Sequence, residues 1–277
     1  MGEKLLIAGP WVGEFGWELF AWQAYIRALS RHYDTTVVIC RESSQPLYAD
    51  FADAFLPTPD LTGLADSFFM HGVDTGDTLR KILQANPNYL RQGTTLVPPR
   101  RLGMPPFTPC TQDEKFGDKQ VTPEYITFGT PGDLTHDYIF HVRNRQLRRD
   151  DNWNIENWEK LRDKLQDSGA SIACIGTLSE ASHIPGTTDL RGTNLLEVFD
   201  VVRNSKCVFG PSSGPMHLAS LCGARHVVWS KDGNRQRYME TWNPHNTPVL
   251  FLSRYSWHPT PEYVFEQFDK WREEWKL

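Results

Sequence analysis

The sequence predicts an α/β protein built from two doubly wound domains. Short apolar runs typical of buried parallel strands alternate with amphipathic helical segments at both ends of the chain. The 277 residues are enough for about two domains of ~150 residues. Seven of the 19 prolines fall between Pro98 and Pro131, where apolar periodicity is weak. This stretch is therefore expected to separate the two domains.

The first half opens on a strand, helix, strand unit. Residues 4–8 form an apolar run that a Gly-Pro pair stops, and residues 36–40 form a second run. Between them, apolar residues recur with helical spacing from Trp17 to about His32. Parallel strands need such a crossover, so this unit indicates a parallel sheet. Further helices are expected near residues 45–54 and 76–85.

The second half alternates more regularly. Its expected strands are 138–142, 171–175, 207–209 and 226–229, and its expected helices are 155–167, 194–204 and 215–222. Residues 261–277 carry apolar positions at helical spacing and predict a helix packed on one of the domains. The expected division is residues 1–135, residues 136–255 and a C-terminal helical segment, 256–277. Both domains are expected to be Rossmann-like and to face a cleft.

Composition excludes several classes of protein. Hydrophobic residues (39%) and charged residues (23%) are at the levels of a folded globular chain. The net charge of −5 gives no overall attraction to nucleic acid or to an anionic membrane, although a local basic patch stays possible. The apolar run near Met1 is too short for a signal peptide, and no run approaches the ~20 residues of a membrane span. We therefore expect a cytoplasmic protein.

The cysteines do not form a disulfide or zinc pattern. They are odd in number and far apart, and three of them sit in apolar strand-like runs. We expect buried free thiols at Cys40, Cys110, Cys174, Cys207 and Cys222.

A first candidate site follows the first strand. The carboxyl ends of parallel strands border the ligand crevice of such domains, so Glu14 and Glu18 are candidates to face it. Glycines such as Gly13 allow close approach of the backbone, and neighbouring aromatic rings would raise a carboxyl pKa by desolvation. The alternative is that these acids only interact with the dipole of the following helix.

A second candidate site is the turn from strand 207–209 into helix 215–222. Small residues lead into a proline at the first helical position, which points backbone N–H groups and the hydroxyls of Ser212 and Ser213 at one place. Such a place binds phosphate. His217 follows closely enough to reach the same anion or a sugar hydroxyl. The alternative is an ordinary capped helix with a hydrogen-bonded histidine.

A third candidate site follows strand 138–142. Four arginines stand within seven residues, and they are Arg143, Arg145, Arg148 and Arg149. If strands 138–142 and 207–209 belong to one parallel sheet, this turn and the phosphate turn lie at the same edge. We therefore expect Arg143 and the Ser213-Gly214 turn to converge on one diphosphate. A solvated charge run is the alternative.

Other reaction classes lack their motifs. The sequence contains no Asp-x-Asp, Gly-x-Gly-x-x-Gly, kinase-type phosphate loop, Gly-x-Ser-x-Gly or His-Glu-x-x-His. Metal-dependent catalysis, dinucleotide binding and hydrolase triads therefore lose support.

In their order along the chain, these residues resemble the ADP-heptose lipopolysaccharide heptosyltransferase family of two-domain, GT-B glycosyltransferases. The resemblance is strongest from Tyr138 to about Ser230. It rests on the basic turn, Asn152-Trp153-Asn154 before a helix, Glu180 after a strand, Asp189-Leu190-Arg191-Gly192, and above all the decamer Gly210-Pro211-Ser212-Ser213-Gly214-Pro215-Met216-His217-Leu218-Ala219.

The resemblance implies a donor site and a base. It gives donor binding to Ser213, Gly214, Met216 and His217, with Ser212 standing where the family usually has an aspartate that contacts the sugar. Gly13-Glu14 stands where the family has a Gly-Asp pair, which implies Glu14 as the general base.

The implied reaction inverts the anomeric carbon of a nucleoside-diphosphate sugar. It needs no metal or other cofactor, because Arg143, Arg145 and a helix N-terminus would stabilise the leaving diphosphate. The nucleotide, the sugar and the acceptor stay open. A glycan or lipid-linked sugar is the family's usual acceptor, and a hydroxymethylated base in DNA is an alternative.

Two other classes of function stay open. One is a nucleotide-sugar epimerase or hydrolase, and the other is a non-catalytic nucleotide-sugar binding protein. If Glu14 is not the base, the next candidates are His71, Asp74 and Asp77.

Overall fold

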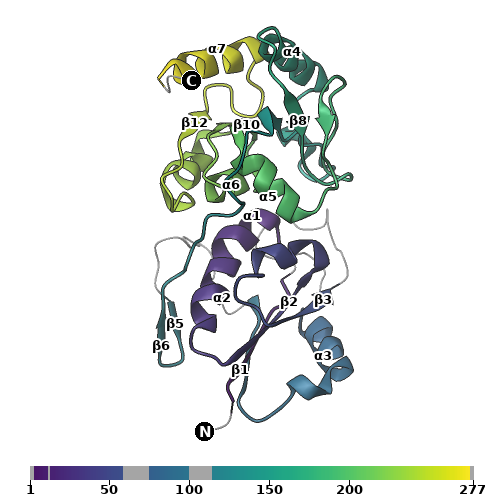
Figure 1. The fold of residues 1–277 in the computed structure, drawn as a ribbon, viewed down its shortest axis with the longest axis vertical. Helices are drawn as coiled ribbons and strands as arrows, with labels where there is room; N and C mark the ends of the chain where they lie inside the picture. Colours follow the sequence, from purple (N-terminus) through teal and green to yellow (C-terminus); the bar gives the residue numbers. More distant parts are fainter. Residues whose placement is uncertain (1–2, 12, 59–74, 100–113, 275–277) are drawn as a thin grey trace. The chain divides into compact units, whose positions relative to one another are not determined.

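The computed structural model describes residues 3–11, 13–58, 75–99 and 114–274. The chain divides into two compact units, Met1–Ile126 and Thr127–Leu277 (Figure 1). Each unit contains a parallel sheet with helices, as expected for two α/β domains.

The first unit contains a four-stranded parallel sheet in the order β3-β2-β1-β4. Its strands are β1 (Leu5–Ala8), β2 (Thr35–Arg41), β3 (Ala54–Thr58) and β4 (Thr94–Val97). Its helical elements are α1 (Phe15–Trp17), the short π-helix η1 (Glu18–Trp22), α2 (Gln23–Ser30), the 3₁₀ helices η2 (Glu42–Leu47) and η3 (Pro87–Tyr89), and α3 (Thr75–Ala85). A small antiparallel pair, β5 (Glu114–Phe116) and β6 (Lys119–Val121), follows.

Sequence predictions for this unit are partly confirmed. The opening strand, helix, strand unit and the helix at 76–85 are present. The helix predicted at 45–54 is wrong, because η2 and turns fill that stretch and β3 begins at Ala54. Pro57 made a strand there hard to predict, and it is tolerated because β3 lies at the edge of the sheet. Strand β4 was not predicted either.

The second unit contains a six-stranded parallel sheet in the order β12-β11-β10-β7-β8-β9. Its strands are β7 (His136–Phe140), β8 (Ile172–Cys174), β9 (Thr188–Asp189), β10 (Ser205–Pro211), β11 (His226–Trp229) and β12 (Val249–Leu252). Its helices are α4 (Ile155–Gln166), α5 (Leu195–Arg203), α6 (Gly214–Leu221) and α7 (Pro261–Glu273), with short turns η6 (Arg149–Asp151), η7 (Asp232–Asn234) and η8 (Arg237–Thr241). Read from β9, the order is that of a Rossmann sheet.

The predicted elements of the second half are all present, and β9 and β12 complete the sheet. The core is rich in aromatic side chains. Trp158 on α4 packs against Phe140, Trp153 and Trp229, with ring centroids 4.9–5.2 Å apart. Phe268 of α7 is buried in the same core, so the C-terminal helix belongs to the second unit.

The boundary between the units lies at Ile126/Thr127, earlier than the expected residue 135. The segment 127–135 belongs to the second unit because its backbone N–H groups donate to helices of that unit. Phe128 N bonds the Leu221 carbonyl at 3.0 Å, and Thr130 N bonds a carboxylate oxygen of Asp200 at 2.7 Å. These bonds fix the segment to α6 and α5.

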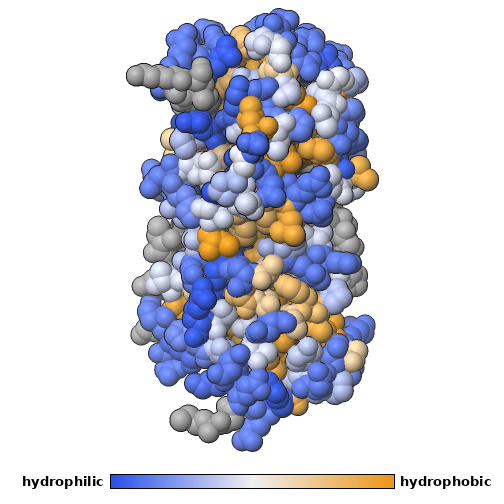
Figure 2. Space-filling model, viewed as in Figure 1, coloured by the Kyte–Doolittle hydropathy of each residue, from blue (hydrophilic) through white to orange (hydrophobic). Residues whose placement is uncertain are grey.

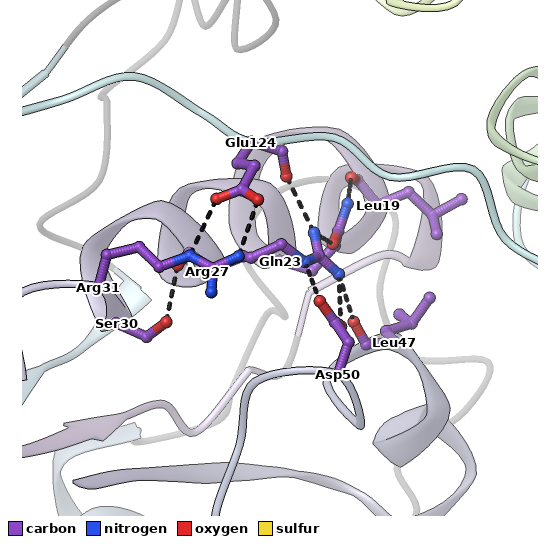
Figure 3. Close-up of polar contacts among 8 residues, drawn as sticks. All are labelled: Leu19, Gln23, Arg27, Ser30, Arg31, Leu47, Asp50 and Glu124. Carbon is purple, nitrogen blue, oxygen red and sulfur yellow. Dashed lines mark hydrogen bonds and ion pairs between the residues drawn. The ribbon is translucent and has the colours of Figure 1, made fainter. Parts of the chain in front are cut away.

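A buried arginine organises the first unit (Figure 3). Arg27 on α2 is fully buried, and its guanidinium donates to the Asp50 carboxylate (2.7 and 3.0 Å) and to the Leu47 carbonyl (3.0 Å). It also donates to the Gln23 side chain and, at 2.9 Å, to the carbonyl of Glu124, 97 residues later in the chain. One charge therefore ties the end of the first unit to α2.

The hydrophilic surface and the buried cysteines agree with what the composition predicts. The face in Figure 2 is mostly hydrophilic, with apolar side chains in small groups. Cys40, Cys174, Cys207 and Cys222 are buried and free, as predicted, and Cys110 lies outside the described residues. Among the described residues, no helix is both long and apolar enough to span a membrane.

Candidate functional site

The three predicted motifs follow strands at the switch points of the two sheets. In the first unit, β1 lies where the strand order reverses, between β2 and β4. In the second unit, the reversal lies between β7 and β10. Ligands of open α/β sheets bind outside the carboxyl ends of strands at such points. The basic turn and the phosphate turn therefore start from neighbouring strands, as the sequence indicated.

The turn from β10 into α6 depends on close packing. A Cβ on Gly210 would lie 2.6 Å from the Met216 sulfur and 3.3 Å from the His141 carbonyl oxygen at the end of β7. The Met216 side chain is fully buried there. Met216 therefore packs in the core, and its side chain is not available to contact a ligand, which narrows the role that the resemblance implied.

Ser213 is the N-cap residue of α6, and Pro215 lies in its first turn. The first N–H groups of a helix have no carbonyl partner within it, so Gly214 and Met216 present donors at this end. The Ser213 hydroxyl oxygen is buried and has no hydrogen-bond partner among the described residues. The arrangement suits an anion.

His217 lies one turn inside α6 and is 5% exposed. Its ring stacks on Tyr238 with centroids 4.1 Å apart and meets the edge of Trp242 at 4.6 Å. Burial, with smaller contributions from Arg237 and His226, lowers the pKa of His217 well below its ordinary value. The imidazole is therefore neutral near pH 7.

Tyr238 is a site residue that no sequence motif marked. It is fully buried on η8, and its hydroxyl accepts a hydrogen bond from Ser213 N at 3.1 Å. The same hydroxyl lies 3.1 Å from the Ser212 hydroxyl oxygen. The only sequence signal near it is a pair of aromatic residues four positions apart, Tyr238 and Trp242.

The basic turn is wrapped around Arg143. This side chain is 3% exposed, and its guanidinium donates to the carbonyls of Arg148 (3.0 Å) and Leu147 (3.4 Å) and to the Asn152 side chain. Asp151 lies 3.8 Å away. We expected Arg143 to contact a diphosphate. The structure instead gives it the role of shaping the turn, because these donors bond the turn itself.

Arg145 is held in a similar way. Its Nε donates to the Glu180 carboxylate at 3.0 Å, and its backbone N and O both bond the Asn152 side chain. Glu180 follows β8, so this pair joins the ends of two neighbouring strands. Arg148 and Arg149 stay exposed on the turn, and the exposed Asp150 follows them with the opposite charge.

In the first unit, the loop after β1 is tightly packed against β2. Gly9 has φ +122°, and a Cβ there would overlap the Ile39 carbonyl, so only glycine fits. The Trp11 side chain donates to the Gly13 carbonyl at 3.1 Å. Glu14 is half-buried at the N-cap of α1, and its carbonyl accepts from the N–H groups of Trp17 and Glu18 at 3.1 Å. These bonds fix the backbone of Glu14 at the start of the helical segment that follows β1.

Glu18 does not face a ligand, and it is more than a helix-dipole acid. It is fully buried, and its carboxylate pairs with Arg41 and accepts from Ser44 (3.1 Å) and Tyr48 (2.7 Å). Burial raises the pKa of Tyr48, so this phenol stays protonated and donates. Glu18 therefore holds the interior together beside the loop, which corrects the expectation that it faces the ligand crevice on the acceptor side.

Of the three alternative bases, the structure describes only Asp77. Asp77 pairs with Arg80 and, at 2.7 Å, with Lys81 on α3, and those pairs lower its pKa. His71 and Asp74 lie outside the described residues. Within the described part of the chain, no cluster of His, Cys, Asp and Glu suits a metal ion. A cavity of about 390 Å³ lies by Asp137 and Lys206, at the opposite ends of β7 and β10 from the motifs.

No protein-family model and no curated protein matches the sequence. Solved structures do match. The E. coli ADP-heptose LPS heptosyltransferase II has 13% identity and a TM-score of 0.61, over 99% of this chain and 100% of that one. The E. coli heptosyltransferase WaaC, solved with ADP, has 13% identity and a TM-score of 0.58, over 96% and 99%.

A glycosyl transferase family 9 protein from Veillonella parvula has 11% identity and a TM-score of 0.61, over 97% of this chain and 96% of that one. The chain has the fold of the heptosyltransferases. The predicted pair of Rossmann-like domains is thereby confirmed, and at the level of fold the likeness covers 99% of this chain.

Proposed function

We propose that this protein is a glycosyltransferase that moves a sugar from a nucleoside-diphosphate sugar to an acceptor hydroxyl. The observation that carries the proposal is the turn from β10 into α6, which presents backbone donors at the switch point of a Rossmann-ordered sheet. The shared fold supports the same class, since the similar WaaC structure was solved with ADP.

In the proposed donor site, the diphosphate accepts hydrogen bonds from the N–H groups of Gly214 and Met216 and from the Ser213 hydroxyl. The partial positive charge at the start of α6 favours the dianion. The turn after β7 adds positive charge beside β10 through its arginines, and Asp151 and Glu180 partly offset that charge. His217, being neutral, serves as a hydrogen-bonding group toward the sugar or phosphate.

In the proposed reaction, Glu14 takes the proton of the acceptor hydroxyl. The acceptor oxygen bonds to the anomeric carbon as the bond from that carbon to the diphosphate oxygen breaks, with inversion. A placed general base contributes roughly 10²–10⁴ in rate. The donors at the start of α6 stabilise the charge that forms on the leaving nucleoside diphosphate, so we propose that no metal ion is needed.

We place the acceptor on the side of the first unit and propose a glycan or lipid-linked sugar. A hydroxymethylated base in DNA is the alternative acceptor, and an assay with both acceptors separates them. Release of free sugar or an epimer without any acceptor would instead indicate a hydrolase or an epimerase. Donor binding with no turnover at all would indicate a binding protein.

The first test is a thermal-shift screen of nucleoside diphosphates. A ligand at 100 times its Kd adds about 2.7 kcal/mol to the free energy of unfolding, which such a screen detects. The absence of any stabilising nucleotide would refute the donor site. Transfer should then survive EDTA, and loss of transfer with rescue by magnesium would contradict the metal-free mechanism.

The second test replaces the proposed base. Glu14→Gln should bind the donor normally and transfer at least about a hundredfold more slowly, because it loses the base and keeps the shape. Glu42→Gln, at an exposed carboxylate of the same unit, is the control. Glu18→Gln is unsuitable as a control, because it breaks the buried pair with Arg41. Full activity of Glu14→Gln would rule out this base.

A further inference from the structure

Tyr238 reaches the phosphate turn from a different part of the sheet. It comes from η8, between β11 and β12, and its side chain is fully buried. Its hydroxyl accepts from Ser213 N at 3.1 Å and has two possible acceptors, the Ser212 hydroxyl oxygen at 3.1 Å and the Ser213 carbonyl at 3.4 Å. A phenol has one proton to donate, so it bonds one of these at a time.

The ring of Tyr238 acts on the other end of the turn. It stacks on His217 with an angle of 11° between the planes, and Trp242 also contacts the imidazole, in an edge arrangement with ring centroids 4.6 Å apart. A buried ring packed against two aromatic neighbours has little freedom to rotate. One side chain thus fixes the residues before α6 and the histidine inside its first turn.

The hydrogen bond to Ser213 also decides which donors a ligand can use. Because Tyr238 already accepts from Ser213 N, the backbone donors left at the start of α6 are those of Gly214 and Met216. Pro215 has none. Rotation of the Ser212-Ser213 peptide would break the bond from Ser213 N, so the Tyr238 hydroxyl opposes that rotation and holds Ser213 as the N-cap residue of α6.

We propose that Tyr238 is a positioning residue of the donor site, which holds the Ser212-Ser213 turn and His217 in the geometry that accepts the diphosphate without touching the donor itself. This proposal rests on the proposed function of the turn. In this proposal, the Ser212 hydroxyl contacts Tyr238 and not the donor. Ser212 therefore influences donor binding only through its hydrogen bond with Tyr238.

The test is nucleoside-diphosphate binding by calorimetry, well below the melting temperature. Tyr238→Phe keeps the ring and removes the hydroxyl, and it should bind about tenfold more weakly, as for the loss of one buried hydrogen bond. Ser212→Ala should weaken binding only about threefold, because the hydroxyl can turn to the Ser213 carbonyl. The double variant should bind no more weakly than Tyr238→Phe. Tyr255→Phe, on the surface, is the control and should bind normally.

Several results would overturn the proposal. Wild-type affinity in Tyr238→Phe would do so, and additive effects in the double variant would mean that Ser212 contacts the donor directly. The ¹H shift of the His217 ring should show stacking in Tyr238→Phe and lose it in Tyr238→Leu. If Tyr238→Phe does not fold, hydrogen exchange decides in the wild type, where rapid exchange of the Ser213 amide would refute the hydrogen bond. Failure of the wild type to bind any nucleotide would overturn the proposed function as well.

Discussion

Acidification from pH 7 to pH 5 should destabilise the second unit. His141, His217 and His226 are buried there. Burial lowers the pKa of His226 to about 4. Burial, with Arg143 and Arg145 nearby, lowers the pKa of His141 to about 4, against a weaker raising contribution from its hydrogen bond with Ile175. The folded unit therefore resists protonation at all three rings.

The size of the effect follows from the difference in pKa between the two states. An unfolded histidine has a pKa of about 6.5, so the unfolded chain binds more protons. The stabilisation is fully present above about pH 6.5 and is lost as the pH falls toward 4. Between pH 7 and pH 5, each ring costs about 2 kcal/mol, and His141 and His226 together cost about 4 kcal/mol. Protonation of His217 destabilises the folded state further. For comparison, the free energy of unfolding of a typical protein is about 5–15 kcal/mol.

The assay is urea unfolding at pH 7, 6 and 5, followed by tryptophan fluorescence from the Trp153, Trp158 and Trp229 cluster. His226→Gln should remove about 2 kcal/mol of the fall in the free energy of unfolding. His258→Gln, at an exposed position, should keep the full fall. Equal stability of the wild type at pH 7 and pH 5 would refute the reasoning, and so would an unchanged pH dependence in His226→Gln.

Two further substitutions test packing and buried charge by the same unfolding measurement. Arg27→Met should cost about 3 kcal/mol, because it strands the buried oxygens that the guanidinium satisfies; Arg31→Met, on the surface, should cost under about 1 kcal/mol, and equal losses would contradict the assignment. Gly210→Ala should cost about 1–3 kcal/mol by crowding the Met216 sulfur, whereas Gly233→Ala, with open space at its Cβ, should change little. An unchanged free energy of unfolding in Gly210→Ala would mean that the turn shifts to make room for the added methyl group.

The sequence predicted most of the fold because the strands of both sheets are short, apolar and parallel. A buried strand such as β1 appears as a continuous apolar run, β7 and β10 each contain a shorter one, and helices such as α4 show a buried stripe. The failures have local causes. In β3, Pro57 obscured an edge strand, and η2 has no repeating pattern. The two-residue strand β9 is too short to show alternation.

The candidate site was predictable in position but not in the roles of its side chains. Residues after β1, β7 and β10 had to meet the carboxyl edges of their sheets, since topology alone places them there. Whether a charged group faces outward or is buried depends on partners distant in sequence. The Glu18 carboxylate is bonded by Arg41 and Tyr48, and the Arg143 guanidinium donates to the turn after β7. A single sequence does not show such pairings.

The buried Arg27 also bears on how the chain is made. Its guanidinium donates to the carbonyl of Glu124, at the very end of the first unit. While the protein is being synthesised from its N-terminus, α2 emerges long before Glu124, and until then Arg27 lacks one acceptor for its charge. A ribosome-bound chain that stops short of residue 124 should leave this arginine open to water. The interior of the first unit around Arg27 is therefore expected to be fully shielded from water only when the last residues of that unit have emerged.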